Sequence, residues 1–308
     1  MPKNSNQPLV YSRGFANLLL ALASIVVALL LLALVRQIMD CRRAEEVSRL
    51  VRERTGGVTP LPDNRDNLPQ VDPPMPDTSK LAGRVLLDQF FPPIGDQNPY
   101  GTCVAWASGY NMKTFLNGRR EGWDSAALAN PANQTSPEDL WYTVPPSARS
   151  RNCQGTDFDA LLLQLSTVGA ATMDRSPYYG TFAPCNTQYI GNSSNTISSY
   201  NYLFRADGEL PTVAQLKGLL NDTIPLLMGM RCGDKFMQCN SSQVLKNETF
   251  RYTGMHALHA VCLVGYDDSL HAFRIRNSWG TSWGDHGSIW IDYDELLSQI
   301  AFCFIRVQ

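Results

Sequence analysis

Residues 95–106 read GDQNPYGTCVAW and place Cys103 at the start of a predicted helix, behind the structure breakers Pro99 and Gly101. A cysteine at a helix N-terminus faces the positive end of the helix dipole and unpaired backbone N–H groups, and both stabilise a thiolate. Most cysteines in such positions only pack in a core. The stretch therefore indicates a nucleophile only if the chain also supplies a base.

His259 is the histidine that the sequence pattern best places to act as this base. Residues 259–266 and 272–277 are short apolar runs that predict two strands of a hairpin. With a three-residue loop at 267–269, His259 faces Asn277 on one side of the sheet. The Asn277 amide oxygen then accepts a hydrogen bond from one imidazole nitrogen, and the other nitrogen remains to take the thiol proton.

A zinc site is the competing interpretation of this region, because His256, His259 and Cys262 are spaced three residues apart. Side chains three residues apart on a strand point to opposite faces, so these side chains do not converge on one ion. The sequence therefore predicts no metal site, and it predicts no cofactor.

Three motifs together resemble the papain-like (C1) cysteine peptidases. They are QNPYGTCVAWAS at 97–108, HAVCLVGY at 259–266 and NSWGTSWGDHG at 277–287. The resemblance extends from about residue 80 to the end of the chain. It implies an α+β fold with two subdomains: a helical left half, an antiparallel β-barrel-like right half and an active-site cleft between them.

The resemblance implies a role for each matching residue. Cys103 would be the nucleophile, His259 the general base and acid, and Asn277 the residue that orients the imidazole. Gln97 and the Cys103 backbone N–H would form the oxyanion hole. A resting pair of thiolate and imidazolium would follow, with the pKa of the thiol far below its usual value.

Five positions are implied to bind substrate: Gly101, Thr102, Gly155, Leu258 and Trp279. Trp279 and Trp283 would also shield the imidazole hydrogen bond from water. The chain departs from the family pattern at Val104, where an aromatic residue is usual, and at Tyr100, where many members have a disulfide cysteine. Residues 153–156, CQGT, hold one glycine fewer than the family's Cys-x-Gly-Gly substrate loop.

Eight cysteines fit an oxidising compartment. The family pattern implies a disulfide between Cys153 and Cys185, and a disulfide between Cys232 and Cys239 would close a short loop. Cys262 lies in an apolar strand, which is typical of an inert core thiol.

Residues 14–38 predict a transmembrane helix, because 14–35 hold no charge and span about 33 Å against a bilayer core of ~30 Å. A cleaved signal peptide is the alternative, but the apolar run is longer than a signal needs and no small-residue cleavage site follows it. We divide the chain into a tail (1–13), this helix (14–38), a charged helix and Pro-rich linker (39–79) and a papain-like domain (80–308).

The orientation of the anchor is contested within the sequence. Two basic residues precede the apolar run and six arginines follow it within 36–54, which favours a cytoplasmic domain. The cysteines and five Asn-x-Ser/Thr triplets favour the opposite side, and we predict an extracytoplasmic domain. In a single-pass protein of this kind, Cys41 would be able to link two chains beside the membrane.

A formal net charge of −2 without a long basic run excludes a nucleic-acid footprint from the predicted functions. We predict a membrane-anchored cysteine peptidase that cleaves peptide or protein substrates. One alternative is a catalytically inactive papain-like domain that serves as a binding or adhesion module. Another is a transglutaminase-like acyl transferase, but that class would orient its histidine with Asp rather than Asn.

Overall fold

The structure is a computed structural model that describes residues 13–59, 61, 67–150, 153–178, 182–251 and 258–308. The chain divides into two compact units, residues 1–48 and 49–308. Each unit is described separately below.

The described part of the first unit is helical. It belongs to α1 (Arg13–Arg54), and the stretch Leu20–Arg42 is long and apolar enough to cross a membrane. Large apolar side chains along this stretch are exposed, among them Leu30 and Leu32. A helix with this composition near an N-terminus can be a membrane span or a signal sequence.

The second unit is built on a sheet of eight strands with the order β1-β3-β8-β4-β5-β6-β7, and β2 pairs with β5. All pairs are antiparallel except β1 with β3. The strands are β1 (Gln70–Val71), β2 (Arg84–Leu86), β3 (Tyr200–Leu203), β4 (Leu226–Arg231), β5 (Leu258–Asp267), β6 (Ala272–Arg276), β7 (Ser288–Asp292) and β8 (Ala301–Val307).

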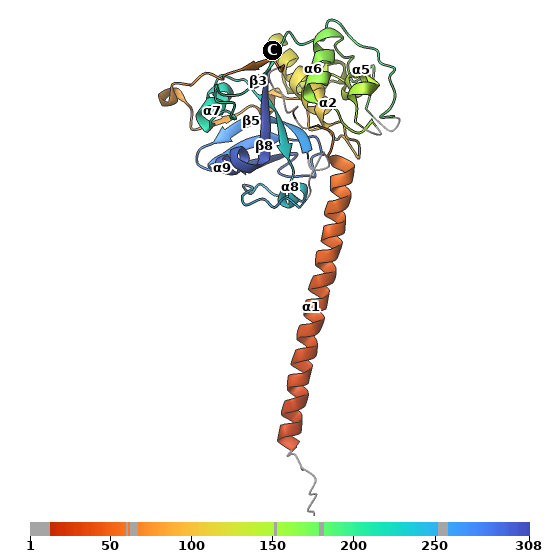
Figure 1. Cartoon of the computed structure of the whole chain (residues 1–308), viewed down its shortest axis with the longest axis vertical. Helices are drawn as coiled ribbons and strands as arrows, with labels where there is room; N and C mark the ends of the chain where they lie inside the picture. The colour runs from red at the N-terminus through yellow and green to blue at the C-terminus, as the bar shows by residue number, and fades with distance from the viewer. Residues whose placement is uncertain (1–12, 60, 62–66, 151–152, 179–181, 252–257) are drawn as a thin grey trace, which may run out of the picture. The chain divides into compact units, whose positions relative to one another are not determined.

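Figure 1 shows α2, α5 and α6 together on one side of this unit, whereas α7, α8 and α9 lie on the side of β3, β5 and β8. The α-helices are α2 (Cys103–Ala105), α3 (Thr114–Glu121), α4 (Ser125–Ala129), α5 (Pro137–Thr143), α6 (Phe158–Thr167), α7 (Val213–Asn221), α8 (Asp234–Met237) and α9 (Tyr293–Glu295). The π-helices are η3 (Trp106–Lys113) and η8 (Leu296–Ile300). The 3₁₀ turns are η1 (Thr78–Lys80), η2 (Asp88–Phe90), η4 (Pro131–Asn133) and η5 (Pro146–Ala148). This α+β arrangement confirms the predicted fold class.

Two helices of the second unit begin at side chains that cap them. The Asp157 carboxylate accepts from the Ala160 N–H at 2.6 Å and begins α6. Thr212 and Gln215 form a reciprocal capping box that begins α7. The run from Cys103 to Glu121 is continuous through α2, η3 and α3. Capping side chains therefore define where α6 and α7 begin.

The register between β5 and β6 corrects our prediction. The structure pairs Asp267 with Ala272, so the turn holds residues 268–271 rather than 267–269. The last turn residue, His271, adopts a left-handed conformation with φ of 52°. The pairing also shifts between Leu263 and Gly265. A longer turn and an irregular strand were not visible in the spacing of apolar residues.

Two parts of the segment that we predict to be a linker are packed in the second unit. β1 joins the sheet by pairing with β3. Residues 55–59, TGGVT, lie between two other segments: the Gly56 N–H donates to the Leu258 carbonyl at 2.9 Å, and Val58 forms an isolated parallel bridge with Thr156. Val58 is fully buried. An extended strand needs no apolar periodicity of its own to be held by backbone hydrogen bonds.

Candidate active site

Cys103 is the first residue of α2 and is fully buried. Backbone N–H groups of Ala260, Val104, Cys103 and Gly57 lie near its sulfur and favour the thiolate. Ala260 follows His259 on β5, so the sulfur lies where the N-terminus of α2 meets this strand. The predicted placement of Cys103 at a helix N-terminus is confirmed.

The ionisation of Cys103 differs from the family expectation. Burial raises the pKa of the thiol to about 12, and the N–H groups around the sulfur offset this only in part. Desolvation disfavours the charged form of any group, and here it outweighs the helix terminus. In this buried arrangement desolvation favours the neutral thiol, and it opposes the resting pair of thiolate and imidazolium that the family resemblance implies.

His259 and Asn277 are brought together as the sequence predicts, in spite of the changed register. The His259 Nε2 lies 2.7 Å from the Asn277 Oδ1, and both side chains are buried. Because a carboxamide oxygen only accepts, Nε2 carries the proton and Nδ1 is the acceptor nitrogen of the neutral ring. The Trp279 ring lies over the imidazole, with 4.6 Å between the ring centroids.

Gln97 is fully buried and tied to the residue that follows Asn277. The Ser278 hydroxyl donates to the Gln97 Oε1 at 2.9 Å, and the Gln97 N–H donates to the Ser278 carbonyl at 2.9 Å. The Gln97 Nε2 donates to the Tyr100 carbonyl at 2.8 Å. Ser278 was not among our predicted site residues, although its position inside the third motif marks it.

An aromatic cluster surrounds the imidazole. The Phe236 ring lies 5.4 Å from Trp279 and 4.8 Å from Trp283, centroid to centroid, and 6.2 Å from His259. The Trp283 indole N–H donates to the Phe236 carbonyl at 3.1 Å. Phe236 was missed because α8 is too short to produce a periodic pattern.

Tyr178 is a second residue that sequence reasoning missed. Its hydroxyl donates to the Gln97 carbonyl at 3.0 Å and lies 2.6 Å from the Thr102 hydroxyl. Its ring packs edge-on against Trp106, with 4.9 Å between centroids. Burial raises the pKa of the Tyr178 phenol, so the hydroxyl keeps its proton. No local motif marks this residue, because its partners are distant in sequence.

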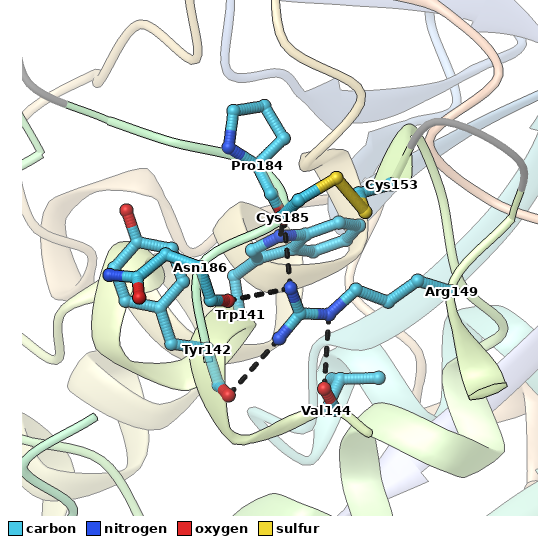
Figure 2. Close-up of a disulfide and its surroundings, with 8 residues drawn as sticks. All are labelled: Trp141, Tyr142, Val144, Arg149, Cys153, Pro184, Cys185 and Asn186. Carbon is cyan, nitrogen blue, oxygen red and sulfur yellow. Dashed lines mark hydrogen bonds between the residues drawn. A yellow bond between two sulfur atoms is a disulfide. The ribbon is translucent and has the colours of Figure 1, made fainter. Parts of the chain in front are cut away.

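The loop that carries Gly155 is held by the disulfide between Cys153 and Cys185, as predicted (Figure 2). Beside it, the buried Arg149 guanidinium donates at 2.7 to 3.1 Å to backbone carbonyls. These carbonyls belong to Tyr142, Val144, Pro184 and Asn186, and the guanidinium lies over the Trp141 ring. Arg149 and the disulfide therefore fix the same two stretches of chain.

Residues 55–59, which we call the covering segment, lie directly over the sulfur. A Cβ atom built on Gly57 would stand 2.5 Å from the Cys103 Sγ and 2.7 Å from the Gly101 carbonyl. The Thr156 N–H donates to the Gly57 carbonyl at 3.2 Å, and the Thr59 N–H donates to the Thr156 carbonyl at 3.0 Å. The burial of Cys103 thus includes cover from this chain's own backbone.

Three of the residues implied to bind substrate are in contact with the covering segment. The Leu258 carbonyl accepts from Gly56, and Gly101 lies against Gly57. A Cβ atom on Gly155, whose φ is +147°, would stand 2.3 Å from the Gly56 carbonyl oxygen. Glycine is therefore needed at 155 for this close approach of two backbones.

The remaining cysteines correct one prediction. Cys232 and Cys239 are both free rather than joined. Cys232 is fully buried at the end of β4, whereas Cys239 is partly exposed after α8 and donates to the Ser241 carbonyl at 3.6 Å. Cys262 is buried in β5, and burial raises the pKa of its thiol to about 12, as an inert core thiol requires.

The competing zinc set falls partly outside the described residues, since His256 is not among them. Elsewhere, ligand atoms of His271, Asp292 and Asp294 lie within 4.8 Å of one another. The Lys246 ammonium already pairs with Asp292 at 2.8 Å, so a cation would have to displace it.

Comparison with known proteins gives a consistent result. The family model for papain family cysteine proteases matches residues 91–304. The senescence-specific cysteine protease SAG12 of Arabidopsis thaliana is 29% identical over 46% of this chain and 39% of its own length. The cathepsin B-like CP2 of Giardia intestinalis is 28% identical over 70% of this chain and 68% of its own length.

Among solved structures, xylellain, a cysteine protease from Xylella fastidiosa, superposes with a TM-score of 0.63 at 21% identity, covering 83% of this chain and 97% of xylellain. At this identity the likeness concerns the fold. The chain spans about two fifths of the length of the first curated relatives it matches.

Proposed function

Because the chain belongs to the papain family of cysteine proteases, whose model matches residues 91–304, we propose that it hydrolyses peptide bonds through Cys103, His259 and Asn277. The observation that carries the proposal is the 2.7 Å hydrogen bond between His259 and Asn277. This bond fixes the tautomer, and it leaves Nδ1 as the acceptor to which we assign the thiol proton.

The proposed reaction follows from these groups. His259 Nδ1 takes the thiol proton, and the sulfur attacks the carbonyl carbon of the scissile peptide bond. The oxygen that becomes negative is stabilised by the Cys103 N–H and the Gln97 carboxamide. His259 then protonates the leaving amine, which leaves an acyl-enzyme. Water hydrolyses this thioester with His259 as base and regenerates the thiol.

Labelling and turnover of the full chain in detergent micelles test this function. A thiol-directed peptidyl epoxide should label wild type at Cys103, and a fluorogenic peptide should be cleaved. Both signals should be lost in Cys103→Ser, whereas Cys41→Ser, which alters an exposed thiol, should keep both. Labelling without cleavage would favour an acyl transferase, and the absence of both after displacement of the covering segment would favour the inactive binding module.

We further propose that α1 anchors the peptidase as a single-pass membrane protein with the second unit on the extracytoplasmic side. The apolar stretch Leu20–Arg42 supports an anchor, and the Cys153–Cys185 disulfide supports an oxidising compartment. Added protease should degrade residues 80–308 in intact cells if this orientation holds. Protection until the membrane is permeabilised would contradict it. In this orientation the exposed Cys41 would lie near the membrane and allow a disulfide-linked dimer.

A further inference from the structure

The short helix α8 carries Phe236 into the aromatic cluster around the imidazole, but its N-cap residue has no side chain. Phe236 is fully buried, and its ring lies 5.4 Å from Trp279 and 6.2 Å from His259, centroid to centroid. The N-cap residue is Gly233, which cannot accept a hydrogen bond through a side chain from the first turn. With four residues, α8 is too short to be stable by itself. Another part of the chain must therefore hold it in place.

Glu248 supplies the missing cap from the loop that follows α8. Its Oε1 accepts from the Lys235 N–H at 2.9 Å, and its Oε2 accepts from the Phe236 N–H at 2.8 Å. Both N–H groups belong to the first turn of α8, where a helix offers its own N–H groups no acceptor. A negative charge at this end also interacts favourably with the helix dipole. The Glu248 carboxylate therefore does at α8 what an N-cap side chain does at other helices.

The backbone that carries Glu248 is held independently of its side chain. The Glu248 N–H donates to the Glu295 carboxylate at 2.7 Å. The Leu245 N–H donates to the Trp290 carbonyl at 2.8 Å. Trp290 lies in β7, at the edge of the sheet, and Glu295 lies in α9. The Glu248 side chain thus connects this edge of the sheet to α8, and removing the side chain leaves its backbone in place.

We propose that Glu248 is a positioning residue for His259, because through α8 it holds Phe236 against the rings that pack on the imidazole. The inference rests on the proposed peptidase function, since it concerns the orientation of the base in that reaction. Without the carboxylate, the first turn of α8 loses two hydrogen bonds and Phe236 can shift. The Trp283 indole, which donates to the Phe236 carbonyl at 3.1 Å, shifts with it. The imidazole then keeps its bond to Asn277 but loses part of the packing that fixes its angle.

Gly233 and Glu248 fit together in a way that makes the cap testable. A Cβ atom built on Gly233 would stand 2.3 Å from the Glu248 Cδ, and the three nearest atoms all belong to the Glu248 side chain. The Gly233 backbone is extended, with φ of −108° and ψ of −176°, which is a conformation that serine adopts at N-caps. A side chain at 233 and the Glu248 side chain therefore exclude each other, and either of them can cap α8.

Glu248→Ala tests the proposal in the full chain in micelles. It should lower kcat of peptide cleavage about tenfold while KM changes less than about twofold, because the base is misplaced and substrate contacts remain. The indole N–H signals of Trp279 and Trp283 should also shift in NMR spectra of protein labelled with nitrogen-15 tryptophan. Trp279→Phe and Trp283→Phe assign these two signals. Glu209→Ala, at an exposed glutamate, should match wild type in kcat, KM and both signals.

Gly233→Ser separates capping from general stability. On the wild-type background the new side chain meets Glu248, so this variant alone should lower kcat. On the Glu248→Ala background the serine hydroxyl can accept from the Phe236 N–H in place of the carboxylate. The same substitution should then raise kcat and return both indole signals most of the way to their wild-type positions.

The outcomes separate this inference from the peptidase function. If the indole signals shift in Glu248→Ala and return in the double variant while wild type cleaves no peptide, the positioning role stands and the peptidase function fails. Unchanged indole signals in Glu248→Ala would overturn the proposal, as would an unchanged kcat when wild type is active. A loss of kcat that Gly233→Ser does not reverse, or a rise in KM in place of the fall in kcat, would also overturn it.

Discussion

His259 and Asn277 form a 2.7 Å hydrogen bond although they do not face each other in the sheet. Asn277 lies one residue beyond β6, whose last residue, Arg276, pairs with Cys262. His259 pairs instead with Met230 on β4. The bond therefore depends on the end of β6 and on the Ser278 contacts that hold Asn277 there, and not on a cross-strand pair.

Asn277→Ala should lower kcat of peptide hydrolysis roughly a hundredfold, because the imidazole loses the group that fixes its tautomer and orientation. KM should change little, since Asn277 is buried behind the ring. Asn277→Asp should restore part of the rate, because a carboxylate still accepts from Nε2, and should shift the pH profile of kcat. An unchanged kcat in Asn277→Ala would remove this residue from the mechanism.

Tyr178→Phe should reduce kcat several-fold with KM nearly constant. The variant keeps the ring against Trp106 but loses the hydroxyl that links the Gln97 carbonyl to Thr102. Each buried hydrogen bond lost costs about 1 kcal/mol, so the unfolding free energy should fall by about that amount. Tyr189→Phe, at an exposed tyrosine, should change neither quantity.

The combination of Tyr178→Phe with Thr102→Val distinguishes positioning from general destabilisation. If the two hydroxyls act through one bond, the losses in log kcat should be less than additive. Fully additive losses, or a rise in KM in place of a fall in kcat, would contradict a positioning role for Tyr178.

The sequence was enough to predict features that depend on a short motif or on which face of a strand a residue occupies. The hydrogen bond of His259 was predicted correctly although the predicted register was wrong. The structure pairs Cys262 with Arg276, two residues from the predicted partner. A shift of two residues keeps a side chain on the same face of a strand, so the error did not separate His259 from Asn277. Motif order marked Cys103, and the family pattern marked the disulfide of Cys153.

The remaining features depend on contacts between segments far apart in the chain. Tyr178 reaches Gln97 across more than 80 residues, and the covering segment reaches Cys103 from a stretch without periodicity. Likewise, the free thiol of Cys232 follows from its burial at the end of β4 rather than from its spacing to another cysteine. Packing between distant segments decides such positions, and a single sequence does not show which distant segments pack together.

Arg149→Lys should lower the unfolding free energy by about 2 to 4 kcal/mol. A lysine ammonium cannot reproduce the planar fork that serves the carbonyls of Tyr142, Val144, Pro184 and Asn186 in Figure 2. Urea unfolding of the disulfide-intact chain measures the change. Arg175→Lys, at an exposed arginine, should unfold like wild type. An equal loss of unfolding free energy at both positions would show that the hydrogen bonds of Arg149 do not stabilise the fold more than an exposed arginine does.

The pH dependence of Cys103 alkylation follows from burial. In wild type the pKa of this thiol is raised to about 12 because the sulfur is removed from water. The reactive thiolate is therefore scarce at neutral pH, and the alkylation rate should keep rising about tenfold per pH unit up to the highest pH at which the fold survives.

Gly57→Ala should change the shape of this profile as well as its height. Once the covering segment is displaced, water and the helix N-terminus act on the sulfur without the full desolvation penalty, so the apparent pKa should fall and the rate should level off at lower pH. The comparison needs only the alkylation rates of Cys103 between pH 5 and 9. Gly83→Ala is the control, because a Cβ at that position meets nothing within 4 Å. Parallel profiles for wild type and Gly57→Ala would mean that the segment does not control the solvation of the thiol, whatever its effect on access.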